Sequence, residues 1–277
     1  MIKENKVKAT VADICKHYGV SKSWYYKTIS TYEERMEFER KVLIAIMIIR
    51  AAYPFYGLRK VWHEIKEVHK IKIGRDRLHR LMREHGLMLP RRYKVVRTTF
   101  PGILATSIEN KIKHLNIDGK NQVWVTDITY IQTHEGVIYL NAIMDLWSRK
   151  IIAYYVSNDL KAVSSLKCLK KALKTVDNID GLIHHSDHGV QYCSNLYLDC
   201  LLAHGIEPSF TGENHCYDNA NIERFFNTLK YDYLLRVPVK SKALAREIIA
   251  NAIKDYNYGR IHEALGYKKP GEVYDAA

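Results

Sequence analysis

The spacing of apolar residues changes at about Asn121, and this change constrains the fold more than any other feature of the sequence. Before it, apolar side chains recur at the spacing of amphipathic helices. After it come three segments rich in β-branched and aromatic residues, QVWVTDITYIQT, GVIYLNAIMDLWSR and KIIAYYVSN. These segments predict an antiparallel meander. The chain therefore combines a helical front part with a rear part built on a sheet.

The segments after the meander alternate between helix and strand. They comprise an amphipathic helix over residues 161–176, the strand GLIHHSD, a helix over about 194–204, a short strand IEPSF and a helix over about 219–231. Strands that begin as a meander and continue in alternation with helices give a mixed sheet with helices on its faces. We therefore predict an α/β fold for the rear part.

The front part contains two segments with the pattern of a helix-turn-helix. In the first, TVADICKHYGVSKSWYYKTIS, Gly19 ends one helix and Ser21 caps the next. A further helix is expected from Tyr32 to Ala52. In the second segment, apolar residues around Leu78 stripe a helix, and its other faces carry the candidate DNA contacts Arg75, Arg77, Arg80 and Arg83. The alternative is a solvated basic face on a helical packing module.

The excess positive charge lies entirely in the front of the chain. Residues 1–113 carry 25 Lys and Arg against 11 Asp and Glu, whereas residues 114–277 carry 18 against 19. This asymmetry favours a front part that binds a polyanion, because Lys and Arg release counterions condensed on nucleic acid. In the basic, loop-like stretch 91–121, Arg91 and Arg92 are placed to follow a phosphate backbone. A merely solvated basic surface is the alternative.

The sequence lacks the patterns of a membrane or secreted protein. No apolar run approaches the roughly 18 to 20 residues that a membrane span needs, and no N-terminal signal pattern is present. The five cysteines are odd in number and form no C-x-x-C pair, which indicates neither a disulfide framework nor a zinc knuckle. We expect a cytoplasmic protein.

Three acidic residues occupy positions that suggest chemistry. Asp127 lies in the middle of the first strand, where its apolar neighbours make an ionised carboxylate costly to bury unless a cation compensates. Asp187 ends the strand GLIHHSD. Glu223 lies one turn into a helix that Asp218 or Asn219 can cap. In an open mixed sheet such acids can converge on one crevice.

Carboxylates without a nearby thiolate suit Mg²⁺ or Mn²⁺ better than zinc. Two such ions about 3.5 to 4 Å apart can activate the attacking oxygen and stabilise the leaving oxygen of an in-line phosphoryl transfer. Asn227 and Lys230 follow Glu223 on the same helix face, so the lysine is placed to hold a DNA phosphate. An ordinary exposed lysine is the alternative. Arg260 could pair with a phosphate or with an acid of the core.

Other acids and histidines compete for these roles. Asp145 is a second candidate for the first acid, although we expect a structural role, with Arg149 as its partner. Glu213 also follows Asp187 but lies in the glycine-flanked stretch TGENH. A zinc site would need the histidines beside Asp187. However, His184 and His185 are consecutive in a strand and point to opposite faces, so we expect His185 to form a hydrogen bond within the active site instead.

The combined motifs resemble those of a known family. Asp127, then Asp187, then thirty-five residues, then Glu223 with Lys230 seven further on, is similar to the signature of retroviral integrases and related bacterial transposases. The segments WVTDITYI, IMDLWSRKI, HSDHGVQY, CYDNANIERFFNTLK and YNYGRIHEALGYKKP resemble the second-frame protein of the insertion-sequence family numbered three. At His188 such proteins more often carry an arginine.

The resemblance implies a ribonuclease-H-like catalytic core and a transposase. Asp127 would bridge two Mg²⁺ or Mn²⁺ ions, Asp187 and Glu223 would each hold one ion, and Lys230 would contact DNA. The implied reaction nicks the element's ends and then joins the freed 3′ hydroxyl to another phosphodiester, without a covalent protein–DNA intermediate. We therefore divide the chain into a small helix-turn-helix-like segment, a helical DNA-binding domain, a basic linker, the catalytic core and a C-terminal helix and tail, at residues 1–31, 32–90, 91–121, 122–235 and 236–277.

The partners implied by the resemblance are double-stranded DNA and further protein. The DNA would be the element's terminal inverted repeats and the target, bound at the bacterial nucleoid. A synaptic complex would need at least a homodimer, and an upstream frame could supply a fusion or partner protein, because the chain shows no sustained heptads. The alternative functions are a DNA-binding regulator or inactive derivative, and a nuclease without joining activity.

Overall fold

The computed structural model describes residues 10–90, 108–212 and 219–277. The chain divides into two compact units, residues 1–92 and 93–277. Each unit is considered by itself. None of the helices in the described ranges is long and apolar enough to cross a membrane. Three residues named above, Arg91, Arg92 and Glu213, lie outside the described ranges.

The first unit contains four helices, α1 (Val11–His17), α2 (Lys22–Ala52), α3 (Leu58–Glu67) and α4 (Arg75–Glu84). Ser21 caps α2, as expected, by accepting the Trp24 N–H at 3.0 Å. Gly19 adopts a left-handed φ of 64° in the turn before it. The helix expected from residue 32 does not begin there, because α2 runs unbroken across residues 31 and 32, where no Gly or Pro interrupts it.

The core of the first unit lies where α3 and α4 pack beside the C-terminal part of α2. Fully buried Ile46, Ile65 and Leu78 come from these three helices. The indole N–H of Trp62 donates to the Ile73 carbonyl at 2.8 Å and fixes the turn that leads into α4. The buried residues of α2 are Val42, Ala45, Ile46 and Ile49, so the first two-thirds of this helix add nothing to the core.

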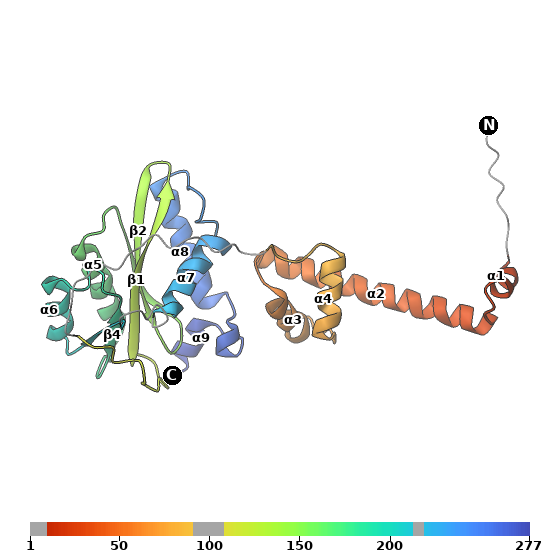
Figure 1. The fold of residues 1–277 in the computed structure, drawn as a ribbon, viewed down its shortest axis with the longest axis horizontal. Helices are drawn as coiled ribbons and strands as arrows, with labels where there is room; N and C mark the ends of the chain where they lie inside the picture. The colour runs from red at the N-terminus through yellow and green to blue at the C-terminus, as the bar shows by residue number, and fades with distance from the viewer. Residues whose placement is uncertain (1–9, 91–107, 213–218) are drawn as a thin grey trace. The chain divides into compact units, whose positions relative to one another are not determined.

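The second unit is built on a mixed sheet of five strands in the order β3-β2-β1-β4-β5 (Figure 1). The strands are β1 (Val123–Thr133), β2 (Gly136–Asp145), β3 (Ile151–Ser157), β4 (Ile183–Ser186) and β5 (Glu207–Phe210). Strands β1, β2 and β3 form the predicted antiparallel meander. Strand β4 pairs in parallel with β1 and with β5. The predicted mixed α/β sheet is confirmed.

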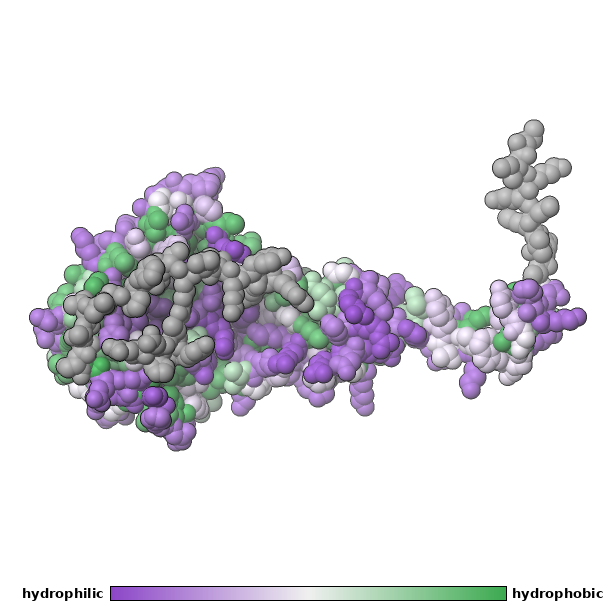
Figure 2. All heavy atoms as spheres, in the orientation of Figure 1, coloured by the Kyte–Doolittle hydropathy of each residue, from purple (hydrophilic) through white to green (hydrophobic). Residues whose placement is uncertain are grey.

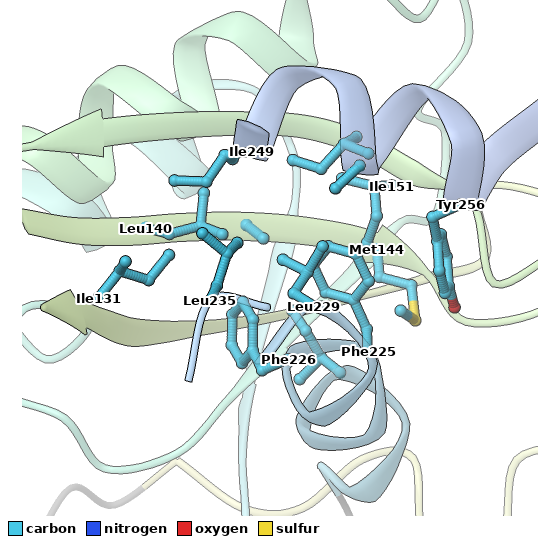
Figure 3. Close-up of a cluster of buried hydrophobic side chains, with 14 of the residues drawn as sticks. Ile131, Leu140, Met144, Ile151, Phe225, Phe226, Leu229, Leu235, Ile249 and Tyr256 are labelled. Carbon is cyan, nitrogen blue, oxygen red and sulfur yellow. The ribbon is translucent and has the colours of Figure 1, made fainter. Parts of the chain in front are cut away.

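Helices cover both faces of the sheet. Helices α5 (Ala162–Leu173) and α6 (Asn195–Ala203) pack on one face, in a cluster with Trp124 of β1. Helices α7 (Ala220–Asp232) and α8 (Lys242–Tyr258) pack on the other face (Figure 3). Val123 and Val125 of β1 belong to the cluster on that face. Because side chains alternate along a strand, β1 is buried on both sides.

The tail belongs to the same core. Ile249 and Tyr256 of α8 lie in the cluster that holds Phe225 and Leu229 of α7 (Figure 3). The chain ends with a short 3₁₀ helix, Glu263–Leu265, and α9 (Pro270–Asp275). Residues 236–277, which the sequence reading set apart from the catalytic core, therefore complete one face of the sheet.

Asn257 joins this tail to the edge strand β3. Its Oδ1 accepts the N–H of Ile151 at 2.9 Å, and its Nδ2 donates to the carbonyl of the same residue at 3.0 Å. All these groups are buried. One side-chain amide thus satisfies a backbone donor and a backbone acceptor at the start of β3.

We predict that Asn257→Ala lowers the free energy of unfolding by about 2 to 4 kcal/mol, because it leaves two buried backbone groups without partners. Urea unfolding followed by tryptophan fluorescence measures the change. Asn251→Ala, at an exposed position of the same helix, is the matched control and should cost less than about 0.5 kcal/mol. Equal losses in the two variants would contradict the role given to Asn257.

Candidate active site

The strand register brings Asp127 and Asp187 side by side. Val125 of β1 pairs with His185 of β4 in parallel register, and each aspartate lies two residues further along its own chain. Because alternate residues share a face, Asp127 projects on the side of Val125, which is the side covered by α7. Two acids sixty residues apart in sequence are therefore neighbours at one edge of the sheet.

Glu223 comes to the same edge from the first turn of α7. Ile222, Phe225 and Phe226 bury the inner face of this helix against the sheet. Asn219, the N-cap residue, does not cap the helix with its side chain. Instead its Nδ2 donates to the Thr126 carbonyl at 3.1 Å. This bond holds the start of α7 against the residue that precedes Asp127.

Electrostatics couples the three acids. Burial, together with the negative charges of Asp187 and Glu223, raises the pKa of the Asp127 carboxyl to about 8, although the Ile128 N–H and the charge of Lys230 act in the opposite direction. Asp187 lies at the surface, yet the protein around its carboxyl raises that pKa as well. The carboxylates of Asp127 and Asp187 thus lack sufficient compensating positive charge.

The acids are neighbours rather than a closed ligand set. Within the ranges that the structure describes, no three His, Cys, Asp or Glu side chains are grouped closely enough to hold one metal ion. The donor chemistry nevertheless fits a hard divalent cation, because carboxylate oxygens in a desolvated position are the ligands such ions prefer. A cation would also supply the positive charge that Asp127 lacks.

Lys230 lies within electrostatic reach of this edge. It is partly buried, and burial lowers the pKa of its ammonium while the charge of Asp127 raises it. Its Nζ lies 4.5 Å from the centroid of the Tyr130 ring, a cation–π contact that holds the ammonium near β1. Asn227, four residues after Glu223, is exposed.

The three histidines bond to different parts of the fold. His184 faces Tyr197, whose hydroxyl lies 3.0 Å from Nε2, and burial lowers the pKa of His184 to about 3. His185 Nδ1 lies 2.9 Å from Ser209 Oγ on the neighbouring strand. His188 Nε2 lies 2.7 Å from the Thr211 carbonyl. Because the rings separate in this way, they form no common zinc site, and His185 bonds to Ser209 of β5.

Asp145 is occupied by structural bonds. It is fully buried, and its Oδ1 accepts the backbone N–H of Ser148 at 2.8 Å and the hydroxyl of the same residue. Its Oδ2 accepts the Asn121 N–H at 2.8 Å. Burial raises the pKa of this carboxyl, and these bonds lower it. Asp145 therefore fixes the turn after β2 rather than serving as a metal ligand. Arg149 donates its backbone N–H to the Asp145 carbonyl at 2.9 Å, and its charge lowers the pKa of the Asp145 carboxyl.

The arginines of α4 are partly neutralised within the first unit. Arg75 lies 3.2 Å from Asp76, and Arg77 lies 3.5 Å from Glu39 and stacks over Phe38. An open groove between α2 and α4 is lined by the arginines at positions 35, 77 and 80 and by the glutamates at positions 34, 39 and 84. Arg80 and Arg83 are exposed, and of the four arginines of α4 they are the more accessible to a DNA phosphate.

Arg260, a candidate DNA contact, pairs with an acid of the core in this structure. Its guanidinium forms an ion pair with Asp232 of α7, and their side chains are only 13% and 2% exposed. Of the two partners that the sequence left open, the structure selects the acid of the core. The pair joins the tail to α7, close to the hydrogen bond from the Tyr233 hydroxyl to Asp255.

The acids are positioned by two residues whose contacts the sequence does not reveal. Asn219 was considered only as a cap, and its bond to Thr126 depends on the tertiary fold. Gly189 follows Asp187 and donates its N–H to Oδ1 of that residue at 3.1 Å. A Cβ at this glycine would lie 3.0 Å from the same oxygen, so a larger residue would crowd the carboxylate. A glycine two residues after a candidate acid is the signal that could have found it.

Three family models match the chain. Two are described as the integrase core domain and match residues 118–216 and 204–270. The third is described as an HTH-like domain and matches residues 37–95. The integrase core models thus cover the sheet, the three candidate acids and most of the tail.

Curated relatives match most of the chain. It is 34% identical over 262 residues to the insertion element IS600 uncharacterized 31 kDa protein of Shigella sonnei, covering 93% of this chain and 96% of that protein. It is 30% identical to the transposase for insertion sequence element IS904 of Lactococcus lactis, covering 77% and 90%. The transposase InsF for insertion sequence IS3A of Escherichia coli is 37% identical, covering 55% and 53%.

Among solved structures, the HTLV-2 integrase catalytic core domain in complex with magnesium aligns with 56% of this chain and 97% of that chain. The TM-score is 0.45 and the sequence identity is 16%.

We predict that Arg260→Ala lowers the free energy of unfolding by about 3 kcal/mol or more, because it leaves the carboxylate of Asp232 buried without its cation. Thermal or urea unfolding measures the loss. Arg236→Ala is the control, because Arg236 is exposed and stacks on Tyr231. A variant that keeps wild-type stability but binds DNA less tightly would instead return Arg260 to the DNA contacts.

Proposed function

The chain belongs to the insertion-sequence transposases that carry an integrase core domain, and on this premise we propose that Asp127, Asp187 and Glu223 are its catalytic residues. Members of this family cleave and transfer DNA strands. The observation that carries the assignment is the coupling of Asp127 to the other two acids at the edge where β1 and β4 run in parallel. Each acid comes from a different element, so the site exists only in the folded chain.

The three acids would hold two Mg²⁺ or Mn²⁺ ions, with Asp127 shared between them and Asp187 and Glu223 each holding one. The fit is supported by the raised pKa of Asp127, because burial and two like charges disfavour its ionised form unless a cation is near. When bound, the ions activate the attacking oxygen and stabilise the leaving oxygen of an in-line displacement.

The substrate is double-stranded DNA, namely the element's terminal inverted repeats and then a target. In the first step a water oxygen attacks a phosphorus at the element end, the P–O3′ bond breaks, and the 3′ oxygen leaves with a proton. In the second step that 3′ hydroxyl attacks a phosphorus of the target strand and displaces a new 3′ oxygen. Each step exchanges one P–O bond for another.

The remaining residues position the DNA. Lys230 keeps a partly desolvated ammonium beside Asp127, which is suited to a phosphate of the bound strand. Asn227 lies on the same face of α7. The exposed Arg80 and Arg83 of α4, with Arg75, Arg77, Arg91 and Arg92, would hold DNA outside the catalytic edge. Cutting and joining two element ends together would need at least two copies of the chain, and an upstream-frame partner would add further end recognition.

Neutralising any of the three acids should abolish the reaction. We predict that Asp127→Asn, Asp187→Asn and Glu223→Gln each lower Mg²⁺-dependent cleavage and joining of labelled element-end DNA by at least about 100-fold. Each variant should bind the DNA as tightly as wild type. Asp199→Asn, an exposed aspartate on α6, is the matched control and should retain full activity.

The products separate the proposed function from its alternatives. Joined strands that disappear in all three variants and in chelator support the transposase. Nicks without joining support a nuclease, and retarded DNA without cleavage supports a regulator. Activity that survives replacement of one acid removes that residue from the site.

Stability should respond to pH through Asp127. Burial raises its pKa from 3.8 to about 8 in the folded chain, so between these pH values the folded state binds more protons than the unfolded state and loses stability as the pH rises. We predict that Asp127→Asn, measured in chelator, has a melting temperature close to that of wild type at pH 5 but higher by at least about 3 °C at pH 8.

Divalent metal provides the complementary test. Added Mg²⁺ at pH 8 should raise the melting temperature of wild type, because binding to the folded state stabilises it, and should raise that of Asp127→Asn much less. If the melting temperatures of the two proteins change equally from pH 5 to pH 8, and equally on addition of Mg²⁺, then ionisation of this carboxylate does not destabilise the fold and the carboxylate does not bind the metal.

A further inference from the structure

The N-terminal part of α2 carries apolar side chains that the described residues of its own unit leave exposed or, at Tyr25, half-buried. The buried residues of α2 begin at Val42, which leaves residues 22–41, about 30 Å of helix, outside the core. Ile29, Tyr32 and Met36 are 37%, 60% and 47% exposed in this stretch. Figure 2 shows hydrophobic side chains among the hydrophilic ones over this part of α2. A helix of this length gains little stability in water without a packing partner.

These side chains form one stripe. Tyr25, Ile29, Tyr32 and Met36 are separated by four, three and four residues, the spacing of the contact line of a coiled coil. The next positions of the same line, three residues before and after, are Lys22 and Glu39. The spacing of all six residues is therefore three, four, three, four, three, which reads the same in both directions along the helix.

We propose that two copies of this chain pair through this stripe, with their α2 helices antiparallel. Reversing one helix places Ile29 opposite Tyr32 of the second copy, and Tyr25 opposite Met36. The same register places Lys22 opposite Glu39 at each end. The arrangement has two-fold symmetry, so the patch is complementary to itself.

Charge selects the antiparallel direction over the parallel one. A parallel pair in register would place Lys22 against Lys22 and Glu39 against Glu39, and would bring Arg35 towards Arg40 of the other copy. Like charges at facing positions destabilise paired helices. The antiparallel pair contains none of these contacts and gains two ion pairs of opposite charge.

The contacts already made by Glu39 are compatible with this pairing. Its carboxylate lies 3.0 Å from Arg35 and 3.5 Å from Arg77 in the same chain, and these contacts lower its pKa. The carboxylate is therefore negative at neutral pH and held at the end of the stripe. The aromatic and thioether pair of Tyr25 and Met36 is favourable in its own right.

The pairing specifies the surface behind the dimer expected in the proposed function, but it is argued from α2 alone and does not depend on the catalytic assignment. It would hold the α3–α4 bundles of the two copies at opposite ends of the paired segment. The second unit of the same chain, or an upstream-frame partner, is the competing occupant of the stripe.

Cysteine cross-linking of the full chain tests both the surface and the direction. Tyr25→Cys and Met36→Cys chains, carrying tags of different size, are oxidised separately and as a mixture. The antiparallel pair predicts a disulfide-linked product only in the mixture, because a disulfide needs Cα atoms within about 7 Å and each cysteine lies far from its own copy. Wild type under the same oxidation controls for the native cysteines.

Each outcome decides the proposal. A product from Tyr25→Cys or Met36→Cys alone would show a parallel pair and overturn the proposed direction. Absence of any product from chains that sediment as monomers would overturn the pairing and leave the stripe to the same chain. Chains that sediment as dimers without a product would move the interface elsewhere.

Substitutions give an independent measurement. Tyr32→Glu should weaken dimerisation at least about tenfold in sedimentation, because it places a charge in the middle of an apolar contact. Lys22→Glu should weaken it as well, and adding Glu39→Lys should restore it. Ile48→Glu, at a 55% exposed apolar position outside the stripe, is the matched control. Cleavage assays on the same samples keep a failure of pairing distinct from a failure of the acids.

Discussion

The candidate site depends on the burial of one carboxylate on a strand that is packed on both faces. Asp127 lies on β1, whose neighbouring residues Trp124 and Val125 belong to the clusters on opposite sides of the sheet. A strand in that position ordinarily carries apolar residues, and a charge there is unfavourable without a cation. The two other acids meet Asp127 where β4 ends and α7 begins. The architecture thus concentrates negative charge at one edge of the sheet.

Structural polar contacts around this edge determine how the acids meet. The amide of Asn219 joins α7 to β1, the hydrogen bonds of Asp145 fix the turn that leads into β3, and the ion pair of Arg260 with Asp232 joins the tail to α7. Each contact satisfies a buried polar group that would otherwise destabilise the fold. The candidate catalytic edge is therefore supported by polar contacts outside the three acids, which explains why its position depends on the whole second unit.

Much of the fold could be predicted from sequence, as could the meeting of the three candidate acids at one edge of the sheet, because both depend on local signals. The alternating pattern around Asp127, the turn residues after Asp187 and the helical spacing around Glu223 each act within about ten residues. Pairings between distant segments could not be predicted. Arg260 had two chemically equal partners, and only packing of the tail selects Asp232. The sequence does not predict the unbroken course of α2, because the change from mixed charge to apolar residues after Tyr32 resembles the start of a new helix.

The anchoring of Asn257 on β3 bears on how such proteins can diverge. The last candidate catalytic residue precedes it by more than thirty positions, yet the amide completes the hydrogen bonding of an edge strand in the same sheet. A recombination event with its breakpoint between α7 and α8 would separate β3 from Asn257. The amide of Asn257 makes the hydrogen bonds to β3 that a further neighbouring strand would otherwise make. Recombination breakpoints that leave a folded protein should therefore lie before β1, so that the sheet and the tail come from the same parent gene.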